Sequence, residues 1–112
     1  MACRITCLVL DAHDPAKLAE FWCAVLDYVV LEYDEQGVEI GAPPGHRDEG
    51  RQVIDFLHTT DKKLQKLRLH IDVNATDRDQ DAELARLLDL GAKPVDIGQG
   101  DVSWHVLADP EG

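Results

Sequence analysis

The chain alternates short runs of β-branched and aliphatic residues with two segments of helical periodicity. The first run, residues 3–11, has no Gly or Pro and predicts a strand. Asp14 and Pro15 follow it as an N-cap and first-turn pair, which predicts that a helix begins there. The next apolar residues recur at i, i+3, i+4, i+7 and i+8 and form one stripe: Leu18, Phe21, Trp22, Val25 and Leu26. We expect this stripe to pack on a sheet.

Three further strands are predicted after this helix. Residues 28–33 and 38–40 flank the turn sequence DEQG, which favours a hairpin. Residues 53–58 (VIDFLH) form the next strand. Between them, residues 41–51 hold two prolines, three glycines and clustered charge, which predicts an exposed, mobile loop.

The second half repeats this order. Residues 68–73 (RLHIDV) alternate polar and apolar, which predicts a strand with His70 on its polar face. Residues 76–81 are acidic and suit a helix N-terminus, and Gly91 suits the helix end. The apolar stripe between them is Leu84, Leu87 and Leu88. Residues 94–97 and 102–108 are predicted strands joined by the turn 98–101.

The two halves therefore form a weak internal repeat of strand, helix and strands. Cys7 precedes Asp14 by the same number of positions as His70 precedes Asp77, so Cys7 and His70 are candidate equivalents. The sequence given stops at the turn sequence DPEG, and we expect the final strand of the second half to be missing from it.

Composition narrows the function classes. A chain of 112 residues suits one domain, and 45% hydrophobic residues are enough to fold it. The formal net charge of -11 argues against nucleic acid and anionic membranes as partners, and no apolar run is long enough to span a bilayer.

The N-terminus shows no export signal, and the three cysteines have no CxxC spacing, which favours reduced thiols in the cytoplasm. No Walker, GxGxxG or GxSxG motif is present, so we expect no nucleotide cofactor.

Three stretches carry a resemblance to a known superfamily: LVLDAHDPAKLAEFW, KLRLHIDVNATD with LLDLGAKPVD, and WHVLADPEG. In their order and spacing the chain resembles the vicinal oxygen chelate superfamily, the glyoxalase, bleomycin-resistance and extradiol-dioxygenase group, and especially its small glyoxalase-like domains. The resemblance implies a single α+β domain over residues 1–112. Two paired βαβββ modules, about 1–60 and about 67–112, would form a curved mixed sheet around a cavity with the helices outside.

The resemblance also implies where a metal would bind. In metal-using members, His, Gln or Glu side chains on the first and last strands of each module hold one divalent ion. His70 stands at such a position in the second module and Asp55 in the first, with Cys7 in place of the first-strand ligand. One His, one Cys and one Asp do not make a six-coordinate oxygen-rich site, whereas a tetrahedral Zn²⁺ site accepts them. The expected ion is Zn, Ni, Mn or Fe, held by His70 and Asp55.

Two functions follow from these expectations and stay open. The first is a glyoxalase-like protein that binds a small organic molecule between its modules, with metal-assisted lyase, isomerase or dioxygenase-type chemistry. The second is a non-catalytic protein that binds or sequesters a small molecule against Cys7, Phe56 and Trp104. Each of these residues also suits an ordinary structural role, a buried thiol or a core aromatic. A third possibility is an interaction domain whose cavity is filled. A homodimer is expected, because the missing strand would leave a sheet edge that a second copy covers.

Overall fold

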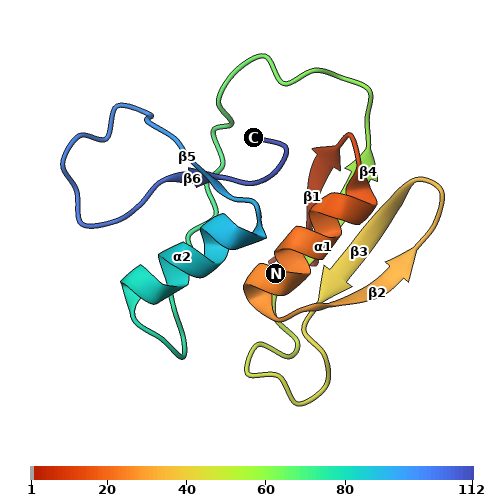
Figure 1. The fold of residues 1–112 in the computed structure, drawn as a ribbon. Helices are drawn as coiled ribbons and strands as arrows, with labels where there is room; N and C mark the ends of the chain where they lie inside the picture. The colour runs from red at the N-terminus through yellow and green to blue at the C-terminus, as the bar shows by residue number, and fades with distance from the viewer. Residues whose placement is uncertain (1) are drawn as a thin grey trace. The chain divides into compact units, whose positions relative to one another are not determined.

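The computed structural model describes residues 2–112, which fall into two compact units. The first unit runs to Asp61 and also takes in Glu111, and the second covers Lys62–Pro110 and Gly112. The architecture is α+β, with two helices, a four-stranded mixed sheet and a two-stranded ribbon (Figure 1). Neither helix of the described residues is long and apolar enough to cross a membrane.

The first unit is a complete βαβββ module, as predicted. Its elements are β1 (Cys7–Ala12), α1 (Pro15–Leu26), β2 (Val29–Tyr33), β3 (Gly37–Gly41) and β4 (Val53–His58). The sheet order is β1-β4-β3-β2, with β1 parallel to β4 and the other pairs antiparallel. Figure 1 shows α1 across one face of this sheet.

Local signals fix both ends of α1. The Asp14 side chain accepts a hydrogen bond from the backbone N–H of Lys17 at 3.2 Å, and Pro15 occupies the first turn, where its missing N–H has no helical partner. The helix ends at Asp27, whose φ of 58° is left-handed, and the Tyr28 N–H donates to the Cys23 carbonyl at 3.1 Å. Asp tolerates this conformation better than most residues, so the chain reverses here without glycine.

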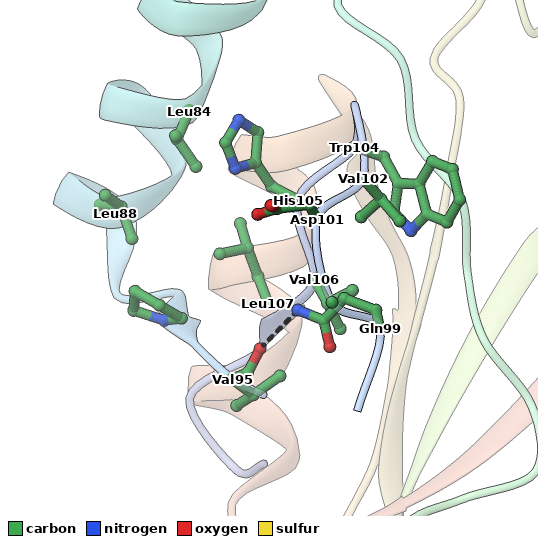
Figure 2. Close-up of a pocket in the computed structure, with 12 residues that line it drawn as sticks. Leu84, Leu88, Val95, Gln99, Asp101, Val102, Trp104, His105, Val106 and Leu107 are labelled. Carbon is green, nitrogen blue, oxygen red and sulfur yellow. Dashed lines mark hydrogen bonds between the residues drawn. The ribbon is translucent and has the colours of Figure 1, made fainter. Parts of the chain in front are cut away.

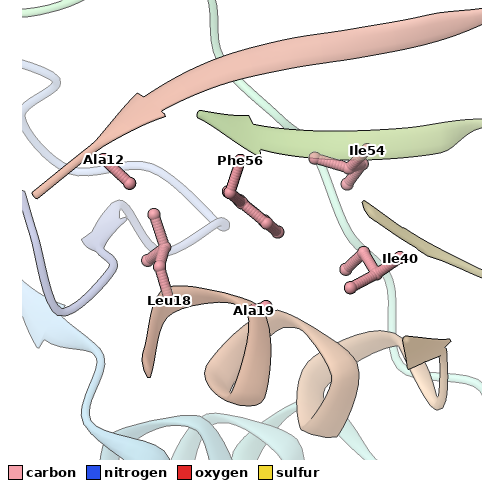
Figure 3. Packing of buried hydrophobic residues seen from close by; sticks show 6 residues of the cluster. All are labelled: Ala12, Leu18, Ala19, Ile40, Ile54 and Phe56. Carbon is pink, nitrogen blue, oxygen red and sulfur yellow. The ribbon is translucent and has the colours of Figure 1, made fainter. Parts of the chain in front are cut away.

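The core lies between α1 and one face of the sheet (Figure 3). Alternate strand residues face the helix, because successive side chains in a strand point to opposite sides. Ile40 and Phe56 are completely buried, each 0% exposed. The full cluster is Ala12, Leu18, Ala19, Ile40, Ile54 and Phe56.

The loop between β3 and β4 has no regular structure, as predicted, and internal contacts hold it. The Tyr28 hydroxyl donates to the Gln52 carbonyl at 3.1 Å, and burial raises the pKa of this hydroxyl. The His46 ring lies edge-on to Tyr28 at 5.9 Å between centroids, and its Nδ1 accepts from the Asp48 N–H at 2.9 Å. These contacts tie the loop to the start of β2.

The second unit holds α2 (Gln80–Leu90) and the antiparallel strands β5 (Lys93–Pro94) and β6 (Leu107–Ala108). The Asp79 side chain caps α2 by accepting from the Ala82 N–H at 2.7 Å, and Gly91, with a φ of 117°, ends it as predicted. On the helix surface, a hydrogen bond from Arg86 holds the pKa of the Glu83 carboxyl below its usual value.

The strand predicted over residues 68–73 is wrong: the structure has no regular element between β4 and α2. Leu69 is 51% exposed there, and Leu67 and Val73 are also exposed. An alternating pattern forms a strand only beside a partner strand, and the second unit supplies only a ribbon of two short strands. In place of the longer strands predicted over 94–97 and 102–108, the structure has only the short strands β5 and β6. The predicted second βαβββ module is thus reduced to α2 and this ribbon.

Candidate functional site

The face of the four-stranded sheet opposite α1 carries two of the residues singled out from the sequence. We call it the far face, and its residues alternate with those of the core. Cys7 and Asp55 lie on it, Cys7 exposed and Asp55 half-buried. The far face comprises Cys7, Val9 and Asp11 on β1, Val53, Asp55 and Leu57 on β4, Glu39 and Gly41 on β3, and Val29, Leu31 and Glu32 on β2.

Three carboxylates cross the far face on adjacent strands. Asp55 is the register partner of Glu39, and Glu39 is the register partner of Glu32. Directly opposed side chains of neighbouring strands have Cβ atoms about 4.5–5.5 Å apart, so like charges there repel. Within residues 2–112, none of the ion pairs involves these three side chains. The row is therefore an uncompensated strip of negative charge that favours hydrogen-bond donors and cations.

Apolar side chains flank this carboxylate row. Val9, the register partner of Asp55 on β1, is 51% exposed. Toward β2, a Cβ placed on Gly41 would lie 2.7 Å from the Leu31 side chain and 3.4 Å from that of Val53, so these two side chains gather over Gly41. Leu31 is 44% exposed. The far face thus combines accessible apolar surface with a strip of oxygen acceptors.

The sequence pattern could not assign these faces alone. Cys7 is exposed, so the alternative of a buried thiol is wrong for it. Phe56, expected to line a ligand pocket, is 0% exposed and packs with Ile40 and Ile54 against α1. Its neighbour Asp55 consequently points to the far face. Glu39 and Glu32 were missed, although the alternation of β3 and the hairpin register contain the signal for them.

His70, the other predicted metal ligand, lies in the irregular segment before α2 in the second unit. Its Nε2 is 3.0 Å from the Lys66 Nζ. An ammonium group has no acceptor, so the imidazole nitrogen accepts this hydrogen bond with its lone pair. A metal would have to take the same lone pair beside a positive charge. Within the described chain, no group of three or more His, Cys, Asp or Glu side chains is placed to hold an ion. His70 and Asp55 belong to different units, and both stay sequence-based candidates for the expected metal.

A pocket of about 300 Å³ lies within the second unit, between α2 and the loop that joins β5 to β6 (Figure 2). Leu84 and Leu88 contribute the α2 wall and Leu107 the ribbon wall. Trp104, the third predicted ligand residue, and His105 both line the pocket, although a regular strand would point only one of them inward. This segment is irregular. Figure 2 shows the His105 ring on the α2 side and the Trp104 ring on the other side, and Trp104 is 60% exposed.

Comparison with known proteins adds one positive result. No curated protein matches the chain. A family model described as a glyoxalase-like domain matches residues 7–112, which is nearly the whole sequence and includes every element of both units. The match agrees with the resemblance of the three sequence stretches and with the βαβββ order of the first unit. The chain belongs to the glyoxalase-like domain family.

Proposed function

We propose that this glyoxalase-like chain binds a small organic molecule against the far face of its four-stranded sheet. The observation that supports the proposal is the composition of this face, where exposed valine and leucine side chains flank the carboxylates of Asp55, Glu39 and Glu32. Small-molecule sites are mostly apolar, with a few polar groups that orient the ligand. The ligand would place its apolar part on Val9 and Leu31 and its donor groups on the carboxylates.

Cys7 would contribute a polarizable sulfur atom at the edge of this site. Its thiol is exposed at the beginning of β1, and its register partner is the apolar Val53. A free thiol behaves there as a small apolar group with a weak S–H donor. The proposal therefore gives Cys7 a contact role and gives Asp55 an orienting role.

The experiment is a ligand screen by NMR that follows the backbone amides of residues 7–12 and 53–58, with Asp55→Asn and Asp14→Asn compared. The proposal expects hits that shift β1 and β4 signals and bind Asp55→Asn several-fold more weakly. Asp14→Asn makes the same charge change at the helix N-cap and retains binding, because Asn also caps helices. Hits that leave β1 and β4 unshifted, or bind both variants alike, would overturn the proposal.

Metal-assisted chemistry is the second candidate function, favoured by the carboxylate oxygens that Asp55 and Glu39 bring to neighbouring positions. Oxygen ligands of this type suit Mn²⁺ and related divalent ions. Elemental analysis of the protein after exposure to Zn²⁺, Ni²⁺, Mn²⁺ or Fe²⁺ tests it. About one ion per chain, lost in Asp55→Asn or His70→Ala, supports a metal site at these residues. No uptake, or uptake that both variants retain, argues against it.

A further inference from the structure

The pocket of the second unit shares no residue with the far face and is shaped by residues of that unit alone. α2 presents Leu84 and Leu88 to it, and the β5–β6 ribbon presents Leu107. The Gln80 side chain donates to the Ser103 carbonyl at 3.1 Å, which fixes the β5–β6 loop beside the beginning of α2. The pocket therefore has one wall of helix and one wall of loop held together by a side-chain hydrogen bond.

Only two side chains on this pocket can carry charge. They are Asp101 and His105, because the lining contains no Lys or Arg. The third polar side chain, Gln99, uses its amide locally: its Oε1 accepts from the Ile97 N–H at 2.8 Å and its Nε2 donates to the Val95 carbonyl. In Figure 2 the Asp101 carboxylate lies with the His105 ring on the side that faces α2.

Asp101 is left without a lysine or arginine partner. It is exposed, and none of the ion pairs or side-chain hydrogen bonds of the described residues involves its carboxylate. The chain as a whole carries a formal charge of -11, so its field also attracts cations and repels anions. A small pocket with leucine side chains on its walls and one carboxylate that has no Lys or Arg partner is complementary to an organic cation and not to an anion.

We infer that this pocket binds a small organic ammonium ion, with its apolar body between Leu84, Leu88 and Leu107 and its ammonium group at Asp101. A pocket of about 300 Å³ accommodates a single ring with a short side chain and is at the lower end of ordinary ligand sites. The ammonium group would donate charge-assisted hydrogen bonds to the carboxylate. This site is additional to the proposed function of the far face, and neither depends on the other.

The test uses benzylammonium chloride as the cationic probe and benzyl alcohol as its neutral counterpart of similar shape. Methyl signals of Leu84 and Leu88 report binding in titrations of the whole chain. We expect benzylammonium to shift these signals and to bind more tightly than benzyl alcohol. Asp101→Asn should weaken benzylammonium about 2- to 5-fold, the effect of one exposed charge pair, and leave benzyl alcohol unchanged.

Asp89→Asn is the matched control, because Asp89 is an exposed residue of α2 outside the pocket and its loss changes the net charge equally. It should bind benzylammonium like the unmodified chain. Asp101→Glu, which keeps the charge, should retain most of the affinity. Equal affinity for the two probes, equal losses in Asp101→Asn and Asp89→Asn, or unshifted Leu84 and Leu88 methyl groups would each overturn the inference. Folding of the second unit is checked by unchanged backbone amide signals of α2 in the variants.

Discussion

At the scale of single residues, the three thiols differ in their surroundings. Cys3 and Cys7 are exposed, whereas Cys23 lies half-buried on α1 among the side chains packed against the core. Burial raises the pKa of the Cys23 thiol, so less of it is the reactive thiolate at neutral pH. We predict that iodoacetamide alkylates Cys3 and Cys7 several-fold faster than Cys23, measured by mass spectrometry of timed digests.

The same reaction in urea provides the control for this prediction. Unfolding removes both the burial and the pKa difference, so all three thiols should then react at similar rates. A Cys23 that reacts as fast as Cys7 in the native protein would contradict its packing on α1. A slow Cys7 would instead show that the far face is covered at the β1 edge.

At the scale of elements, the approach of β3 to β4 depends on a glycine. A Cβ on Gly37 would lie 2.2 Å from the backbone oxygen of Phe56, which pairing holds in place. We predict that Gly37→Ala lowers the free energy of unfolding by about 2 kcal/mol or more, because the two strands must separate. Gly41→Ala is the matched variant on the same strand. Its Cβ would meet the Leu31 side chain, which can move, so this variant should lower the free energy of unfolding by less. Urea unfolding compares the two, and equal losses would contradict the close approach.

Helices and turns that are determined by residues close together in the sequence were predictable. Strands and sheet faces that are determined by contacts between residues far apart in the sequence were not. Asp14 and Pro15 mark the start of α1 and Gly91 marks the end of α2, because caps act within one helical turn. The β2–β3 hairpin follows from its turn sequence in the same way. The strand expected around His70 needs a partner strand that the second unit does not provide. The faces of Asp55 and Phe56 depend on which side α1 covers, and the Asp55–Glu39–Glu32 row depends on pairing between β2, β3 and β4.

At the scale of the whole molecule, negative charge is the dominant electrostatic feature. The formal charge of -11 makes the folded chain repel itself, and the row of Asp55, Glu39 and Glu32 concentrates part of this repulsion on one sheet. The homodimer expected from the sequence stays a prediction, checked by light scattering across a concentration series. A second copy would bring two such charges together, so we expect any self-association to strengthen as salt is added.

The charge also determines how stability responds to salt. We predict that Glu39→Gln raises the free energy of unfolding by about 0.2–1 kcal/mol at low ionic strength, because Glu39 is the central carboxylate between Asp55 and Glu32. Glu20→Gln removes the same formal charge on the exposed surface of α1, outside the row. It should raise the free energy of unfolding by less than Glu39→Gln does. Added NaCl should stabilise the unmodified chain and shrink the advantage of Glu39→Gln, since salt screens exposed charges. Denaturant unfolding at several salt concentrations measures both effects. Equal gains from the two variants would mean that net charge alone, and not the cross-strand row, limits the stability of this sheet.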